Sequence, residues 1–300
     1  MTSVPFITVF TPTYNRCHTI GKCYESLKKQ SNKSFIWLII DDGSTDGTDE
    51  LVKGWQSIDN GFEIRYIYKE NGGLHTGYNV AIENADTEFM MCIDSDDYLE
   101  DEAIQTIESF WKENGREEYA GIVALDRYEN GKIIGDLLPN RKSVNLIDLY
   151  VGKYKLNNGD RKNVIKTKLY KSVAPMKSFD NEKNFNPHYM HLEISKKYDF
   201  LVLNEPLCVV EYLEGGMTLN IFKQYLNSPK SFAEIRRLAM SFENTPFLFK
   251  VKTAIHYNSS CILGKDLKNL FKINHKFFVV SMFPVGFLFS VYTKYKALKR

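Results

Sequence analysis

The feature that most constrains the fold of this sequence is a strand, turn and helix pattern that occurs four times in its first 115 residues. The four apolar, β-rich runs are Phe6–Phe10, Phe35–Ile40, Ile64–Tyr68 and Phe89–Ile93. Each run is followed by a polar turn and then by apolar residues at helical spacing. Continuously apolar strands that alternate with helices are typical of a parallel sheet covered on both faces. The pattern therefore predicts an α/β fold with a mostly parallel sheet.

The pattern becomes less regular after about residue 120. Short strands are predicted at Gly121–Leu125 and Phe200–Leu203, and the polar stretch KYKLNNGDRKN between them is interpreted as a connection. Helical periodicity returns from Ile221. We therefore predict one α/β domain over 1–220, with halves 1–115 and 116–220, and a helical extension over 221–300.

Composition excludes some classes of protein. The 39 basic and 37 acidic residues give a net charge of only +2, so no broad basic field is available and nucleic acid is not an expected partner. The five cysteines are an odd number without a CxxC pair, which fits neither a disulfide framework nor a thiolate zinc site. Because the N-terminus also lacks a signal-peptide pattern, we expect a reducing, cytoplasmic setting.

The acidic turn DSDD at 94–97 directly follows the fourth apolar run. In a parallel sheet, ligands bind at the carboxyl ends of the strands, where this turn is predicted to lie. Mg²⁺ or Mn²⁺ usually takes one or two protein carboxylates together with phosphate oxygens, so the turn predicts a metal–diphosphate site. The alternative is a solvated turn that caps the helix starting near Asp101.

Two further polar turns are predicted at the same edge. In DDGSTD, at 41–46, a carboxylate can accept a hydrogen bond from the N–H of a uracil-like base; the alternative is a capped loop. In NGGLHTGYN, at 71–79, the two glycines allow backbone amides and a helix N-terminus to approach a phosphate or sugar. His75 and Asn79 share one helical face, although a histidine at a helix start is often only a cap or a solvated side chain.

These motifs carry a resemblance to a known family. TPTYNR, the apolar strand with DDGSTD, NGG before a helix with Asn79, and DSDD resemble, in this order, family 2 inverting glycosyltransferases of the GT-A fold. NNGDRKN, NEKNFNP and LNEPLCVVEYLEGGMT are similar to a subgroup that builds bacterial surface polysaccharides such as capsule, O-antigen and exopolysaccharide. The resemblance covers about residues 5–220 and implies a Rossmann-like sheet that binds a nucleotide-sugar.

The resemblance implies a role for particular residues. Asp42 is expected to bind uracil, and Asp94 and Asp96 are expected to bracket the ribose and a diphosphate bound to Mg²⁺ or Mn²⁺, with Asp97 as an adjacent candidate ligand. The residues assigned to the donor are Thr11, Pro12, Tyr14, Arg16, Asp42, His75, Asn79, Asp94 and Ser95. The implied activity is transfer of a sugar, with inversion, from a UDP-sugar to a saccharide or a lipid-linked saccharide.

The catalytic base is where the sequence departs from the family pattern. An inverting transfer needs a group that takes the proton of the acceptor hydroxyl. Related enzymes offer a carboxylate near a helix start, in this subgroup a glutamate after proline, whereas this chain has His188 after Pro187. We predict His188 as the base, because its unperturbed pKa lies near physiological pH. Glu193, Asp180 and a mechanism without a base remain alternatives.

The C-terminal segment Phe277–Tyr292 contains sixteen residues without a charge. It is shorter than the ~20 apolar residues that span a bilayer, and lysines flank it on both sides. We predict shallow contact with an anionic membrane surface, at the inner face of the cell membrane. The alternative is a buried C-terminal helix that Pro284 kinks.

Two other functions remain open. A nucleotidyltransferase on a similar sheet needs a glycine- and lysine-rich loop after the first strand, and TPTYNR lacks one. A non-catalytic protein that binds nucleotide-sugar or saccharide is the second alternative, because the expected carboxylate base is missing.

Overall fold

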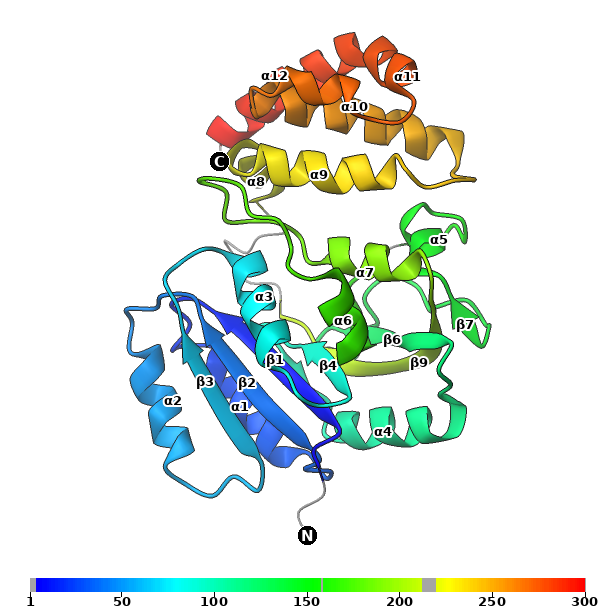
Figure 1. Cartoon of the computed structure of the whole chain (residues 1–300). Coiled ribbons are helices and arrows are strands. Elements are labelled where there is room, and N and C mark those ends of the chain that lie inside the picture. Colours follow the sequence, from blue (N-terminus) through cyan, green and yellow to red (C-terminus); the bar gives the residue numbers. More distant parts are fainter. Residues whose placement is uncertain (1–3, 158, 212–219, 300) are drawn as a thin grey trace.

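The computed structural model describes residues 4–157, 159–211 and 220–299. These residues form a mixed nine-stranded sheet with helices on both faces and a helical extension at one end (Figure 1). The strands are β1 (Ile7–Thr13), β2 (Phe35–Asp41), β3 (Glu63–Tyr68), β4 (Phe89–Cys92), β5 (Tyr98–Leu99), β6 (Tyr119–Arg127), β7 (Ser143–Val144), β8 (Arg161–Lys166) and β9 (Asp199–Val209). The helices are α1 (Ile20–Lys29), α2 (Thr48–Gln56), α3 (Leu74–Asn84), α4 (Ala103–Asn114), α5 (Leu146–Tyr150), α6 (Thr167–Val173), α7 (His188–Ser195), α8 (Ile221–Asn227), α9 (Pro229–Ala239), α10 (Phe247–Leu263), the 3-10 helix η2 (Leu267–Phe271), α11 (Lys276–Ser281) and α12 (Phe283–Leu298).

The first half of the sheet confirms the predicted α/β pattern. Strands β3, β2, β1 and β4 lie side by side in this order and are parallel. All seven residues of β2 are buried, as expected for a strand covered on both faces. The predicted and observed strand bounds differ by one to three residues at some ends.

The second half differs from the prediction. The sheet continues as β8, β6, β9 and β5, and β8 runs antiparallel to both β4 and β6. The prediction of a mostly parallel sheet is therefore wrong for this half, although β6 and β9 pair in parallel. The interpretation of KYKLNNGDRKN as a connection is also wrong at its end, because β8 begins at Arg161 in the middle of the sheet. The first residues of β8 are polar, so the sequence does not show an apolar run there. Their burial is possible because polar partners come from other strands.

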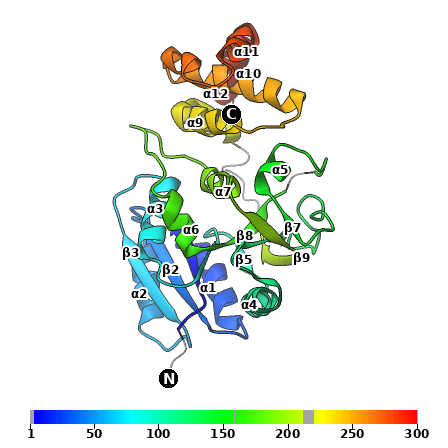
Figure 2. The same cartoon turned by 45° about the vertical axis from the view of Figure 1, so that its right-hand side comes forward.

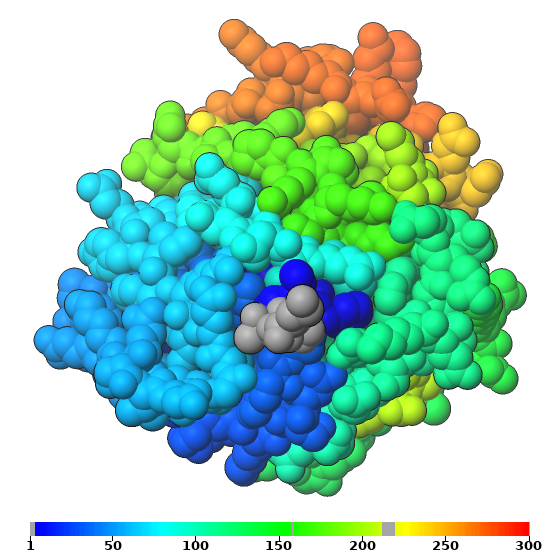
Figure 3. Space-filling model, turned by 60° about the horizontal axis from the view of Figure 1, so that its bottom comes forward, coloured from blue at the N-terminus to red at the C-terminus, as the bar shows by residue number. Residues whose placement is uncertain are grey.

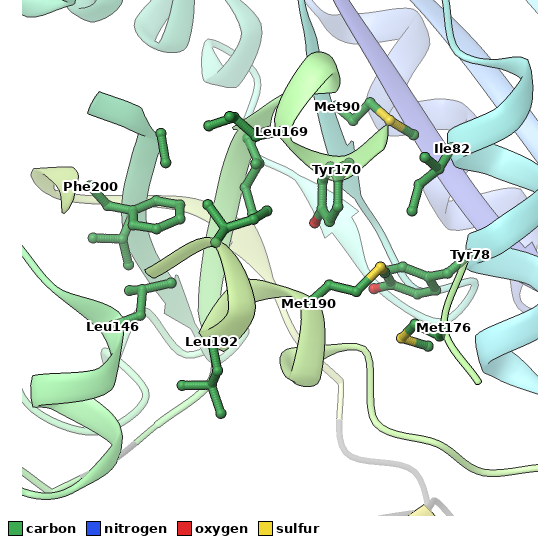
Figure 4. Close-up of a cluster of buried hydrophobic side chains, with 14 of the residues drawn as sticks. Tyr78, Ile82, Met90, Leu146, Leu169, Tyr170, Met176, Met190, Leu192 and Phe200 are labelled. Carbon is green, nitrogen blue, oxygen red and sulfur yellow. The ribbon is translucent and has the colours of Figure 1, made fainter. Parts of the chain in front are cut away.

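Two apolar cores lie on opposite faces of the sheet. On one face, α1 and α4 cover residues such as Val9 and Trp37. On the other, α3, α6 and α7 cover Phe10, Leu38 and Met90 (Figure 2). The close-up of this second core shows side chains of α3, α6 and α7 directed toward one another (Figure 4). The polar turns lie at the edge of the sheet, between the helices that cover its two faces.

The extension formed by α8 to α12 stands beyond the sheet and stacks above α7 in Figure 1. It has its own buried cluster, which includes Ala254, Tyr257 and Val279. Helix α9 joins both parts, since Ile235 and Leu238 belong to the core of the sheet and Ala233 to that of the extension. From the end near the N-terminus, the two halves of the sheet domain form one continuous surface and the extension lies behind it (Figure 3).

The extension begins at about the predicted residue. The predicted division at residue 220 coincides with the start of α8 at Ile221, and the division into domains stays a prediction. The segment Phe277–Tyr292 forms two helices, which break at Met282 with Pro284 in the first turn of α12. Among the described residues, no helix is long and apolar enough to cross a bilayer.

Candidate active site

The turns that follow β1 and β2 are joined at the carboxyl edge of the sheet. The N–H of Asp42 donates to the carbonyl of Thr13 (2.8 Å), and the N–H of Asn15 donates to the Ser44 hydroxyl (2.8 Å). The Asn15 side chain accepts from the N–H of Thr45 (2.8 Å). The TPTYNR and DDGSTD turns therefore form one hydrogen-bonded surface, as their predicted position at the same edge required.

Asp42 is buried and holds the NGG turn. Its carboxylate accepts hydrogen bonds from the N–H of Gly72 (2.9 Å) and of Gly73 (2.7 Å), and it pairs with the ammonium of Lys69. Asp42 therefore ties the end of β2 to the start of α3. The predicted contact of Asp42 with uracil stays a prediction; a carboxylate has about four acceptor sites, so the contacts observed do not fill it.

Gly73 is required by its backbone and by its neighbours. Its φ of +94° is unfavourable for other residues, and a Cβ would lie 2.0 Å from the carbonyl oxygen of Lys183. The same carbonyl accepts from the N–H of Leu74 (3.2 Å). The NGG turn is thus fixed between Asp42 and the segment around Lys183.

His75 and Asn79 face that same segment. Asn79 accepts from the N–H of Met176 (2.8 Å) and donates to its carbonyl (3.1 Å), so both ends of the amide are used. His75 is 1% exposed, and its Nε2 lies 3.1 Å from the Ser178 hydroxyl. Burial lowers the pKa of His75, so the ring is neutral near pH 7. These contacts give both residues a role in positioning the chain beside α3. Their predicted contacts with the nucleotide-sugar stay predictions.

The residues of TPTYNR divide between the two faces of β1. The side chain of Thr11 is fully buried and accepts from the indole N–H of Trp37 (2.9 Å), so it points into the core on the α1 side. Only the backbone of Thr11 is then left to contact a nucleotide base. The side chain of Pro12 points to the opposite face of the strand and lies beside Gly77 of α3. Tyr14 is exposed and Arg16 half-buried, so both can reach a ligand above this edge.

The DSDD turn is held between β4 and β9. The N–H of Ile93 donates to the carbonyl of Phe10 (3.0 Å), and the N–H of Asp97 donates to the carbonyl of Asp94 (3.0 Å). Directly after the turn, β5 pairs with the end of β9. Asp94 is exposed, Asp96 is half-buried, and Ser95 and Asp97 are buried. The turn therefore leaves Asp94 and Asp96 open to solvent, while Asp97 is buried, and the predicted contacts of these residues with a ligand stay predictions.

A buried lysine lies next to this turn. Lys162 of β8 is 8% exposed, and its ammonium is 3.8 Å from a carboxylate oxygen of Asp126, which is 2% exposed. Burial raises the pKa of Asp126 to about 6 and that of Asp97 to about 8, and the positive charge of Lys162 opposes both shifts. Desolvation by the surrounding protein also raises the pKa of Asp94, although this residue reaches the surface, and Lys162 again opposes the shift. The cluster therefore carries more carboxylates than its one buried cation can compensate.

The chemistry of this cluster fits a divalent cation. Only one group of three Cys, His, Asp or Glu side chains in the described residues has ligand atoms within 4.8 Å of one another, namely Cys17, His18 and Asp46, outside DSDD. In the described part of the chain, the DSDD turn thus supplies at most two convergent carboxylates, and the effect of the Asp96 charge on the pKa of Asp94 indicates that these two are near each other. Mg²⁺ or Mn²⁺ bound with a diphosphate needs no more, and its charge would compensate the excess carboxylates.

His188 is the first residue of α7 and lies among aromatic side chains. Its ring centroid is 5.4 Å from that of Tyr150 in α5 and 5.6 Å from that of His191. Burial lowers the pKa of His188 to about 4. The ring is therefore neutral at physiological pH, as a base must be, but it holds a proton only weakly. Its predicted role stays a prediction.

Three residues of the acidic cluster are not identified by sequence reasoning. Asp126, Asp160 and Lys162 come from the second half, and the charge of exposed Asp160 raises the pKa of Asp94, which places the two carboxylates near each other. Asp160 and Lys162 fall within NNGDRKN, so the family motif contains them, but its polar pattern does not reveal that β8 begins there. Asn158 of that motif and residues 212–218 of LNEPLCVVEYLEGGMT lie outside the described residues.

The fold and this edge define a class. Similar folds occur in TarS residues 1–349 of S. aureus in complex with UDP-GlcNAc (TM-score 0.61, 21% identity, 94% of this chain and 79% of that one) and in the mannosyltransferase PcManGT of Pyrobaculum calidifontis in complex with GDP-Man and Mn²⁺ (TM-score 0.58, 15% identity, 99% and 84%). The domain is thus an α/β domain of the GT-A type, with acidic turns at the carboxyl edge of its sheet.

A model of glycosyl transferase family 2 matches residues 8–184, and this chain belongs to that family. The chain is 34% identical over 101 residues to the glycosyltransferase GlyA of Streptococcus pneumoniae. This match covers 34% of this chain and 14% of GlyA. It is 34% identical over 93 residues to the putative teichuronic acid biosynthesis glycosyltransferase TuaG of Bacillus subtilis. This second match covers 31% of this chain and 36% of TuaG. The chain thus matches well under half the length of these relatives, and the matched domain is that of a glycosyltransferase.

Proposed function

We propose that this protein transfers a sugar from a UDP-sugar to a saccharide acceptor, with inversion and with the help of Mg²⁺ or Mn²⁺. The observation that carries the proposal is the carboxyl edge itself. Asp42 and the NGG turn lie at the ends of β2 and β3, and the DSDD turn, with exposed Asp94 and half-buried Asp96, lies at the end of β4 on the other side of β1. Membership of family 2 supports the reaction, and the UDP-GlcNAc bound by the structurally similar TarS supports the class of donor.

The residues of the site have distinct tasks in this proposal. Asp42 and the TPTYNR turn hold the uridine. The NGG turn keeps Asp42 in place, because the N–H groups of Gly72 and Gly73 donate to its carboxylate and are therefore not available to the phosphates. Asp94 and Asp96 would hold the cation, which would supply positive charge to the diphosphate leaving group. The acceptor oxygen forms a bond to the anomeric carbon while the bond from that carbon to the diphosphate oxygen breaks. The bonding electrons leave with UDP, and the proton of the acceptor hydroxyl passes to a base.

The acceptor in this proposal is a growing saccharide, attached to a lipid, in the synthesis of a bacterial surface polysaccharide. The name of TuaG, a relative that matches over part of its length, supports a role in cell-surface polymers. The protein then works as a peripheral protein at the inner face of the cell membrane. The exposed apolar residues of α11 and α12 support this location.

A panel of nucleotide-sugars tests the proposal. The full chain is incubated with UDP-sugars and with GDP-mannose, with Mn²⁺ or with EDTA, and release of the nucleoside diphosphate is measured with and without saccharide acceptors. We expect release from at least one UDP-sugar that requires the cation and increases with acceptor. Tight binding without turnover would instead favour the non-catalytic binding protein, and pyrophosphate release from UTP would favour the nucleotidyltransferase.

Replacing Asp42 is expected to weaken uridine binding even without a metal. Asp42→Ala removes the acceptor for the N–H groups of Gly72 and Gly73 as well as the proposed acceptor for the base. A hydrogen bond to a charged group contributes about 1.5–3 kcal/mol, which corresponds to roughly 10- to 100-fold in affinity. Calorimetric titration with uridine in EDTA measures the effect.

Two variants separate the roles of Asp42. Lys69→Met removes only its ion pair, and Asp49→Ala removes an exposed carboxylate of α2 that pairs with Lys53. We expect Asp49→Ala to bind uridine like the parent and Lys69→Met to lose less affinity than Asp42→Ala. Equal losses in the Asp42 and Lys69 variants would show that Asp42 acts through its ion pair with Lys69 and not through a contact with the base.

His188 is expected to control the acidic limb of the pH profile. If its ring is the base, His188→Ala lowers turnover by about 10²- to 10⁴-fold and leaves the affinity for the donor unchanged. Because the pKa of His188 is lowered to about 4, the ring is neutral above that pH and the rate falls only as the pH drops through about 4. Initial rates between pH 3.5 and 8 at saturating donor measure this, and His188→Glu is expected to retain part of the activity.

Three carboxylates provide the comparison for His188. Asp180 is exposed, Glu193 pairs with Lys196 (2.8 Å), and Asp160 is the one whose charge acts on Asp94. Parental turnover in His188→Ala would exclude the histidine. The base would then be the residue among Asp160→Asn, Asp180→Asn and Glu193→Gln whose replacement abolishes turnover but preserves UDP binding.

A further inference from the structure

Helix α12 is packed with its small residues inward and its large apolar residues outward. Its buried residues are Gly286, Ser290, Thr293 and Ala297, at intervals of four, three and four, so they form one helical face. Its exposed apolar residues are Val285, Phe287, Leu288, Val291, Tyr292, Tyr295 and Leu298. At about 100° per residue the two sets lie on opposite sides of the helix. A surface helix in water has the reverse arrangement.

The inner face of α12 lies close against α10. A Cβ on Gly286 would be 2.4 Å from the Cβ of Asn258 and 3.0 Å from the carbonyl oxygen of Ile255. Asn258, which is fully buried, donates to the carbonyls of Ala254 (3.0 Å) and of Val279 in α11 (2.7 Å). Close backbone contact through small residues, with polar side chains between the helices, is typical of helices that pack in lipid.

The exposed apolar surface extends beyond α12. Phe271 at the end of η2 is 67% exposed and Phe277 of α11 is 84% exposed. Exposed Phe247, at the start of α10, contacts the ring of Phe278 with centroids 6.2 Å apart. We call the exposed apolar side chains of η2, α11 and α12 the apolar face of the extension.

The charges on the segment that carries the apolar face are all positive. From residue 267 to the end of the sequence there is no Asp or Glu. The described lysines of this segment are Lys268, Lys272, Lys276, Lys294, Lys296 and Lys299. Lys294 and Lys296 lie on the two sides of the apolar stripe of α12, at helical angles that flank Leu288 and Tyr292. Each lysine near an anionic bilayer contributes to attraction, which salt weakens.

We propose that the apolar face of the extension docks onto a lipid bilayer that carries anionic headgroups. Its large side chains insert at the level of the headgroups, the flanking lysines contact the lipid phosphates, and the small-residue interface of α10 and α12 stays within the protein. A second copy of the chain fits this face less well, because its lysines would meet lysines and segment 267–299 offers no acidic partner. With sixteen residues, α12 lies in the interface and does not cross the bilayer.

The docking surface specifies which part of the protein contacts the membrane in the proposed function, and its biological role rests on that proposed function. The segment around Lys183 connects the docking surface to the active site. Lys183 holds the start of α3, and Glu182 accepts from the N–H groups of Lys230 (2.8 Å) and Ser231 (2.7 Å) at the start of α9. In Figure 1 the extension lies at the end of the sheet domain where α3 is found, opposite the N-terminus, so a bilayer bound to the extension would lie at that end and a lipid-linked acceptor would approach from it.

Flotation with vesicles tests the docking surface without any donor. The full chain is mixed with vesicles of phosphatidylcholine alone, or with a third of phosphatidylglycerol, and the bound fraction is measured at low and high salt. The variant Leu288→Glu/Val291→Glu/Tyr295→Glu changes three side chains that are 66%, 51% and 50% exposed. We expect the parent to bind the anionic vesicles, and the variant to bind them roughly tenfold or more weakly.

A matched control adds the same charge elsewhere. Val4→Glu/Ile58→Glu/Leu137→Glu changes three apolar residues that are also exposed, at 82%, 55% and 57%. We expect this control to bind vesicles at least half as well as the parent, and both variants to release UDP from a UDP-sugar at the parental rate without vesicles. Equal vesicle binding by both variants, no binding by the parent, or a parental dimer that the α12 variant separates would overturn the proposal. Failure of UDP release in every protein would instead contradict the proposed function.

Discussion

Asp96→Asn is expected to abolish metal-dependent binding of UDP and to lower transfer by about 10³-fold or more, because a bound cation contributes several kcal/mol to a diphosphate leaving group and each 1.36 kcal/mol is tenfold in rate. The substitution is nearly isosteric, and Asp96 is half-buried in a turn that is closed by the backbone hydrogen bond from Asp97 to Asp94. We therefore expect the melting temperature without ligand to stay close to that of the parent. Titration of UDP with Mn²⁺ and with EDTA, together with initial rates, measures the effect.

The control for this prediction lies five residues further along. Asp101→Asn removes an exposed carboxylate just before α4 and is expected to change neither UDP binding nor rate. Asp94→Asn should behave like Asp96→Asn, since the proposed function assigns both carboxylates to the cation and neither is buried. An Asp96 variant whose affinity for UDP still responds to Mn²⁺ as the parent does would place the cation elsewhere, and Cys17, His18 and Asp46 would be the next group to test.

Lys162→Met is expected to lower the free energy of unfolding by about 3–5 kcal/mol, the usual cost of removing one partner from a buried ion pair. Lys162 is 8% exposed and compensates Asp126 directly, and its charge also acts on Asp94 and Asp97. Without it, the folded state must protonate these carboxylates or accept their repulsion. Chemical denaturation at pH 7 measures the loss, which should become smaller as the pH is lowered toward 5 and the carboxylates of the folded state take up protons.

A double variant identifies the cause of that loss. Lys162→Met with Asp126→Leu replaces the ion pair by two apolar side chains, and we expect it to be more stable than Lys162→Met alone by at least about 1 kcal/mol. Lys168→Met is the control, since Lys168 is exposed and pairs only with exposed Glu117, and it should change stability by less than about 0.5 kcal/mol. A Lys162 variant as stable as the Lys168 control would show that the cluster does not need this cation.

The sequence alone determined the first half of the sheet domain, residues 1–115. Strands β1 to β4 are continuous apolar runs whose surroundings are helices encoded a few residues away, so local periodicity is enough to predict them. Because parallel strands share an edge, the order of the polar turns along the chain is enough to place Asp42, the NGG turn and DSDD together. The family resemblance rests on the same local motifs, and the match over residues 8–184 confirms it.

Only the tertiary structure decided the second half of the sheet domain, residues 116–220, and the packing of the tail. Strand β8 looks polar because the charge of Lys162 is compensated by Asp126 of β6 and by carboxylates beyond β4, partners that periodicity along one segment cannot reveal. The contacts of His75 and Asn79 depend likewise on a loop about a hundred residues away. In the tail, composition indicates an apolar segment, but only packing against α10 shows that α12 turns Gly286 and Ser290 inward and Leu288 outward. Local pattern fixes where a strand or helix forms, whereas the partner of each buried charge or face is set by contacts distant in sequence.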